Sequence, residues 1–171
     1  MIKLNLGCED KILPGFINVD ITPRSGVKVM DLNKKKLQFE SDYADYFLIS
    51  HLIEYIDSPA DFMHEVWRIA KKGAIVDLVV DHYSFGFSYA EMRHKRPGFS
   101  YFIFGNKNWN KEFHGKFRVL KKRLNFTRKN MLFLNKIFNP LINASPTLYE
   151  RFFSYIIPCS EIHFRLKVVK E

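Results

Sequence analysis

The first 81 residues alternate short apolar runs with polar stretches. Five runs have the length of a strand, and they cover residues 2–7, 16–21, 27–32, 45–51 and 74–81. The last run, within GAIVDLVVD, is rich in β-branched residues and follows Gly73, which is typical of a buried parallel strand. The pattern therefore predicts a parallel sheet in this half of the chain.

A helix is predicted between the fourth and fifth strands. Ser58 has the residue type of an N-cap and Pro59 suits the first helical turn. Apolar residues then recur at helical spacing at Phe62, Val66 and Ile69. The basic stretch 71–73, which ends in glycine, predicts the last turn and the C-cap. Strands separated by helices indicate a parallel sheet covered on both faces.

The C-terminal half has a different pattern. Residues 117–126 and 162–170 alternate apolar with polar positions, as strands do when one face is less buried. They flank an aromatic-rich segment that contains Pro140, Pro146 and Pro158. Because the chain has 171 residues and no linker-like stretch, we expect residues 1–171 to form a single domain.

Composition narrows the class of protein. The hydrophobic share of 47% is that of a soluble globular protein, and no apolar run reaches the roughly 18–20 residues of a membrane span. Strand-like residues begin at once, without the pattern of a signal peptide. Cys8 and Cys159 lack metal-ligand spacing and suit a reducing compartment. The cytoplasm is the expected location.

The formal charge of +9 is concentrated in residues 107–136. Glu112 is the single acid of this basic block, whose ten cations are Lys107, Lys111, Lys116, Arg118, Lys121, Lys122, Arg123, Arg128, Lys129 and Lys136. Such a block attracts anions, which include nucleic acid, phosphorylated substrates and acidic membranes. It is equally consistent with a solvated face of a basic protein.

The stretch LNLGCEDKILPGFINVD holds the first candidate site. A strand, a turn at Gly7, a second strand and an acid at Asp20 are typical of a Rossmann-like half that binds a ribose. Glu9 stands where a second glycine is expected. Only the eight residues 8–15 separate Gly7 from Phe16, so the first helix must be short or missing.

Motifs along nearly the whole chain resemble those of class I (Rossmann-like) S-adenosylmethionine-dependent methyltransferases. In order they are LNLGCE (4–9), INVDI (17–21), VMDL (29–32), SHLIEYI (50–56) and EVWRIAKKGAIVDLVVD (65–81). GFINVD (15–20), HKR (94–96) and YERF (149–152) resemble a small branch of uncharacterised bacterial and archaeal members. The resemblance implies an α/β Rossmann-like, mostly parallel seven-stranded sheet with helices on both faces and a C-terminal antiparallel hairpin.

The resemblance also implies S-adenosylmethionine as cofactor. The residues expected to bind it are Asn5, Gly7, Cys8, Glu9, Asp20, Ile21, Asp31, Leu32 and Ser50. Asp20 would accept the ribose hydroxyls, and Gly7 would let the backbone approach the methionine part. Asp31 would accept the adenine amine while Leu32 packs on the ring, or Asp31 would begin a turn with Asn33. Glu9 would oppose the cofactor's carboxylate, hold its ammonium group, or face solvent.

Candidate catalytic residues follow the fourth and fifth strands, where ligands sit in open parallel sheets. They are His51, Asp81 and His82, with Asp81 and His82 as an acid–base pair. Glu54 is an alternative structural partner for His51. The basic segment 92–99 is expected to face the substrate, and we expect no metal site, because no second ligand lies at zinc spacing from His94.

The sequence thus predicts methyl transfer to a small acceptor that is anionic or contains a sugar. One alternative is a binding protein of the same fold that has lost catalysis, marked by Glu9. Another is an RNA-binding or RNA-modifying protein, since residues 101–136 interleave cations with aromatics. A third is peripheral membrane contact by residues 133–158, although prolines break that segment as a single amphipathic helix. The oligomeric state does not follow from the sequence.

Overall fold

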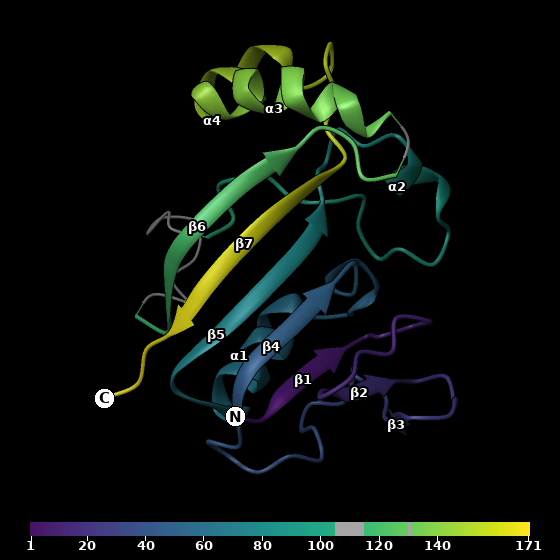
Figure 1. The fold of residues 1–171 in the computed structure, drawn as a ribbon, viewed down its shortest axis with the longest axis vertical. Coiled ribbons are helices and arrows are strands. Elements are labelled where there is room, and N and C mark those ends of the chain that lie inside the picture. Colours follow the sequence, from purple (N-terminus) through teal and green to yellow (C-terminus); the bar gives the residue numbers. More distant parts are fainter. Residues whose placement is uncertain (105–114, 130) are drawn as a thin grey trace.

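The protein is described by a computed structural model, which covers residues 1–104, 115–129 and 131–171 (Figure 1). Its seven strands form one sheet in the order β3-β2-β1-β4-β5-β7-β6. They are β1 (Lys3–Leu6), β2 (Ile17–Asp20), β3 (Val27–Val29), β4 (Ala44–Ser50), β5 (Ala70–Asp81), β6 (Phe117–Asn125) and β7 (Glu161–Val168). The first five strands are parallel, and β7 is antiparallel to β5 and β6. The predicted sheet is confirmed.

Helices are unevenly distributed along the chain. The longest is α1 (Pro59–Ile69), in the crossover from β4 to β5. Residues 7–16, all of them described, connect β1 to β2 through turns without a helix, which confirms the short or missing first helix. The other helical elements are η1 (Ile53–Tyr55), α2 (Phe87–Ala90), η3 (Leu132–Leu134), α3 (Asn135–Ala144), α4 (Pro146–Leu148) and η4 (Tyr149–Phe153).

Helix α1 begins as predicted and ends earlier than predicted. The Ser58 hydroxyl accepts a hydrogen bond from the Asp61 N–H, and Pro59 occupies the first turn. The chain leaves the helix at Ala70, which already pairs with Ala44 in the sheet. The stretch 71–73 therefore belongs to β5. Gly73, at φ +83°, lies in an irregular part of this strand instead of capping the helix.

Strand β3 is shorter than the predicted 27–32. It pairs with β2 only as far as Val29, opposite Asp20. Met30 then donates its N–H to the Asp20 carbonyl oxygen, and Met30 and Leu32 are buried in the core. The apolar character of 30–32 therefore reflects burial after the strand has ended.

The core lies on the sheet, between strand residues and α1. In β7, Ile162, Phe164, Leu166 and Val168 are buried, while the intervening His163, Arg165 and Lys167 are exposed. This alternation confirms the prediction of a strand with one solvated face. Cys8 and Cys159 are both buried and free.

The C-terminal helices α3 and α4 lie together beyond the end of the sheet at which β5 and β6 end (Figure 1). Helix α3 continues through Pro140, but the segment 133–158 is not a single helix, as predicted. The interruption falls at Ser145, after which Pro146 begins α4. Among the described residues, no helix combines the length and apolar character that a bilayer crossing requires.

Candidate functional site

Three neighbouring strands supply ionisable side chains at the end of the sheet where the parallel strands finish. His51 follows β4, Asp81 ends β5, and Glu161 begins β7, directly paired with Asp81. Strand β7 is antiparallel, so its first residue lies at the end of the sheet where the parallel strands finish. The sheet thus brings together residues that are 110 positions apart in the chain.

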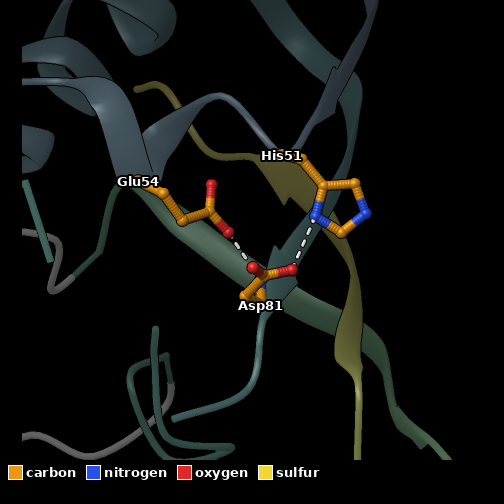
Figure 2. A group of neighbouring side chains, drawn as sticks. All are labelled: His51, Glu54 and Asp81. Atoms are coloured by element: carbon orange, nitrogen blue, oxygen red, sulfur yellow. Dashed lines mark hydrogen bonds and ion pairs between the residues drawn. The ribbon is translucent and has the colours of Figure 1, made fainter. Parts of the chain in front are cut away.

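His51 lies between the two carboxylates. Its Nδ1 is 3.0 Å from Asp81 Oδ1 (Figure 2), and its Nε2 is 3.1 Å from Glu161 Oε2. The backbone of His51 has φ +52°, a left-handed conformation that residues other than glycine seldom adopt. The His51 N–H donates to the Val79 carbonyl oxygen, which holds this bend against β5.

The two carboxylates set the charge of the imidazole. Burial by itself lowers the pKa of His51, but hydrogen bonds to Asp81 and Glu161 outweigh it and raise that pKa to about 9. Burial likewise opposes ionisation of Asp81, yet the His51 hydrogen bond helps to hold its pKa below the usual range. His51 is therefore an imidazolium at neutral pH.

Arg128, which follows β6, is a member of the cluster that the motifs did not single out. Its Nη1 donates to Asp81 Oδ1 over 2.7 Å and lies 3.1 Å from His51 Nδ1. Its guanidinium also lies 4.6 Å from the ring centroid of Phe85. The sequence offered only one hint, which is that Arg128 belongs to the basic block.

Glu54 is completely buried behind this cluster. Its Oε1 accepts the Asp81 N–H, and Oε2 has no hydrogen-bond partner among the described residues. Burial raises the pKa of Glu54. Glu54 thus fixes the backbone of Asp81, whereas the sequence suggested a structural partnership with His51.

His51, Glu54 and Asp81 form a compact group whose ligand atoms lie within 4.8 Å of one another (Figure 2). Metal ions bind such groups when the imidazole is neutral. Here Asp81 Oδ1 is shared by His51 Nδ1 and the Arg128 guanidinium, so His51 and Asp81 belong to an ion-pair network with Arg128 and Glu161. Glu54 joins this network through the Asp81 N–H.

His82 lies outside this network. It is fully buried, with Nδ1 2.7 Å from Ser84 Oγ and Nε2 3.2 Å from Glu150 Oε1. Consecutive residues of an extended chain point to opposite sides, so Asp81 and His82 diverge. The expected Asp81–His82 pair is therefore not formed, and the imidazole beside Asp81 is that of His51.

A cavity of about 710 Å³ opens beside the network. Its lining includes Glu9, Ser50, His51, Asp81, Arg128 and Glu161. His94 also lines it, so the segment 92–99 reaches the cavity as the sequence analysis expected. Because Glu9 lies on the loop after β1, the cavity extends from the ionised network to the first motif.

The loop after β1 is tightly packed. Gly7 has φ +71°, and a Cβ at this position would lie 2.8 Å from Leu52 Cδ1. Leu52 thus leaves no room for a side chain at Gly7, and the expected approach of the cofactor to this backbone stays a prediction. Cys8 and Asn5 are buried, and the Asn5 amide donates to the Lys11 carbonyl oxygen and to Asn18 Oδ1. Asn5 therefore shapes the loop from within.

Glu9 and Asp20 are joined through the backbone. Asp20 Oδ2 accepts the Glu9 N–H, and Asp20 Oδ1 accepts the Thr22 N–H, each over 2.9 Å. Glu9 is exposed and has φ +44°, so its backbone adopts a conformation that glycine normally supplies. The loop thus retains the shape of a glycine turn although the second glycine is replaced.

The third motif is placed differently from the expectation. Asp31 Oδ1 accepts the Asn33 N–H over 2.9 Å, which is the turn that the sequence left open as an alternative. Leu32 is buried in the core, so its side chain does not lie at the surface where a ring would stack. Ile21, in contrast, is exposed next to Asp20.

These residues fit the cofactor that the motifs imply. A carboxylate has about four acceptor positions, so the two N–H groups that hold Asp20 leave it able to accept ribose hydroxyls. The exposed Ile21 offers an apolar surface beside Asp20. Glu9, whose N–H holds Asp20, and Ser50 both line the cavity.

Comparisons with known proteins bear on the domain and the fold. Residues 17–77 match the methyltransferase domain family. An uncharacterized protein of Methanocaldococcus jannaschii is 31% identical over 77 residues, which are 44% of this chain and 38% of that protein. The chain thus spans about two fifths of the length of this curated relative.

Two solved structures share the fold. One is an S-adenosylmethionine-dependent methyltransferase of Archaeoglobus fulgidus, with a TM-score of 0.61 at 14% identity, covering 96% of this chain and 85% of that one. The other is an S-adenosylmethionine-dependent methyltransferase of Mesorhizobium loti, with a TM-score of 0.58 at 12% identity and coverages of 97% and 90%. The chain therefore has the fold of class I S-adenosylmethionine-dependent methyltransferases, and its residues 17–77 match the methyltransferase domain family.

Proposed function

We propose that this protein transfers the methyl group of S-adenosylmethionine to a small acceptor bound in the 710 Å³ cavity. The observation that carries the proposal is the continuity of this cavity. It runs from Glu9, after β1, and Ser50, at the end of β4, to the network of His51, Asp81 and Arg128. The whole chain would act as one domain.

In this proposal the cofactor lies across the carboxyl ends of β1, β2 and β4. Asp20 would accept the ribose hydroxyls, and Ile21 would pack beside the adenine. Gly7, Cys8 and Glu9 form the loop that the methionine part would follow, with Asn5 supporting it from inside and Ser50 facing it from β4. Asp31 and Leu32 would contribute by shaping the turn and the core beneath it.

The acceptor would lie against the ionised network. When bound, S-adenosylmethionine supplies an already activated methyl group, so the protein's main task is to align the acceptor. At neutral pH the His51 imidazolium and Arg128 offer positive charge. Lys11 and Lys129 line the same cavity and add to it. Glu9 and Glu91 also line the cavity, so an anionic acceptor, such as an acidic or phosphorylated sugar, would bind beside these cations and away from the two acids.

Proton removal from an acceptor hydroxyl would fall to His51, oriented by Asp81. The base form of His51 requires loss of the imidazolium proton, whose pKa is about 9. Transfer to an alcohol should therefore accelerate as pH rises toward 9, whereas transfer that needs only the positive charge should slow over the same range. His82, buried among Ser84 and Glu150, would support the structure from the other side.

Titration calorimetry with S-adenosylmethionine tests the proposal first. We expect saturable binding at one site, and its absence would refute the proposal. Methyl transfer from labelled cofactor to a panel of acidic and neutral sugars then tests the acceptor. His51→Gln should reduce transfer by at least tenfold and leave cofactor binding intact, while His64→Gln, on α1 away from the cavity, should change neither. Cofactor binding without transfer to any acceptor would favour a binding protein of this fold.

Nucleic acid is the second candidate acceptor, favoured by one observation. The edge strand β6 carries three exposed cations, Arg118, Lys121 and Arg123. Strand β6 pairs with β7 on one side, and its other side has no neighbouring strand among the described residues. Lys107, Lys111 and Glu112 of the basic block lie outside the described residues. RNA and DNA binding measured over a salt series decides this candidate, because several phosphate contacts produce a steep loss of affinity with salt.

A further inference from the structure

The C-terminal helical segment carries large apolar side chains that face solvent. Six of them, between 54% and 74% exposed, recur four residues apart on either side of the break at Ser145: Phe133, Ile137 and Leu141 before it, and Leu148, Phe152 and Ile156 after it. These six side chains are called the outer face. Soluble proteins seldom expose so many large apolar groups together, and such patches usually mark an interaction site. The outer face therefore requires an explanation.

Polar anchors fix which side of α3 faces outward. Asn139 Oδ1 accepts the Phe126 N–H over 2.7 Å, and Asn143 Oδ1 accepts the Leu124 N–H over 2.9 Å. Ile142 is buried on the same side. Because these contacts hold the inner side of α3 against the end of β6, the apolar outer face cannot turn into the core.

The surroundings of the outer face are cationic. In the described residues from 115 to 157, Glu150 is the only acid, and its side chain is mostly buried against His82 and Ser100. Lys129, Lys136 and Arg151 are exposed beside the apolar residues. A partner that complements this surface must offer apolar contact together with negative charge.

A second cavity lies beside the first residues of the C-terminal helical segment. It measures about 640 Å³ and is lined mainly by apolar groups, which include Phe85, Phe87, Phe126, Met131, Leu134 and Pro158. Phe87 also lines the acceptor cavity.

We propose that the outer face binds the surface of a bilayer that contains anionic lipids. Amphipathic helices with aromatic and aliphatic residues on one side and Lys or Arg beside them bind in this way, with the axis in the plane of the interface. A second copy is a poorer partner, because an isologous contact would bring like charges together around Lys136 and Arg151. The inference goes beyond methyl transfer and does not depend on it.

Vesicle flotation tests the proposal with the full chain. Vesicles of phosphatidylcholine and phosphatidylglycerol should bind the protein, and vesicles of phosphatidylcholine alone should bind it far more weakly. The double variant Phe133→Ser, Phe152→Ser should reduce partitioning at least tenfold, since each side chain would lose apolar burial in the interface. Lys136→Gln with Arg151→Gln should reduce binding to the anionic vesicles about 25-fold.

The matched control is Leu120→Ser with Val169→Ser, which removes two exposed apolar groups outside the outer face. This control should bind vesicles like the unaltered chain, and thermal melting should show that all variants remain folded. Equal partitioning of the outer-face variant and the control would overturn the proposal. So would self-association without lipid that the outer-face variant abolishes, because a second copy would then cover the face.

Discussion

The two ends of the proposed site hold their acids in different ways. At β2, backbone N–H groups of Glu9 and Thr22 hold Asp20, and all three residues lie within one short stretch of chain. At β5, the side chains of His51 and Arg128 hold Asp81, and these residues come from three distant segments. The first arrangement is local, and its acid is held by backbone groups. The second is a charge network whose members depend on one another.

The largest expected effect is on the network. Asp81→Asn would leave the His51 imidazolium and Arg128 without their shared carboxylate, in a partly buried place. We expect a loss of about 3–5 kcal/mol in the free energy of unfolding at pH 7, measured by urea denaturation. Asp42→Asn is the control, because the ion pair of Asp42 with Lys170 is exposed and should contribute less than about 1 kcal/mol. Equal losses in the two variants would contradict a cooperative network.

The pH dependence of stability should show the same network. The pKa of His51 is about 9 in the folded state and about 6.5 in the unfolded chain. The stabilisation is thus complete below pH 6.5 and is lost as pH rises through 9, by about 3 kcal/mol. His51→Gln should remove this decline, while His64→Gln should keep it. A decline that persists in His51→Gln would assign it to another group.

A smaller effect is expected at the local end. Asp20→Ala should weaken S-adenosylmethionine binding about tenfold, or about 1.4 kcal/mol, because the ribose hydroxyls lose their acceptor. Calorimetry measures the change directly. Asp10→Ala serves as control, since Asp10 is an exposed acid on the loop after β1 and pairs with Arg24. Unchanged affinity in Asp20→Ala would remove this residue from the site.

The smallest effect concerns Glu9. Its left-handed backbone costs about 1 kcal/mol for a residue with a Cβ, so Glu9→Gly should stabilise the fold by roughly that amount. Glu9→Ala removes the same charge but keeps the Cβ, and should not stabilise. Because the side chain is exposed, we expect cofactor affinity to change less than about threefold, with a free-energy change below about 0.7 kcal/mol. Equal stability of the two variants would mean that the backbone is unstrained.

Local patterns predicted most of the parallel sheet. The predicted runs 2–7, 16–21 and 45–51 end one residue after β1, β2 and β4, because alternation, turns and caps act over a few residues. The same patterns misplaced the boundary between α1 and β5. Pairing of Ala70 with Ala44 there outweighs the capping preference of the basic stretch 71–73.

By itself, the sequence determined where strands and motifs follow one another along the chain. It also determined that the first helix is short or missing and that Asp20 ends the second strand, because each of these features depends on neighbouring residues. Only the tertiary structure decided that Asp81 pairs with His51 and Arg128 while His82 turns away. Only it revealed the exposed apolar side of α3. Such features depend on which strands lie adjacent and which face is covered, and contacts between residues as distant as 51 and 161 leave no periodic signal in the chain.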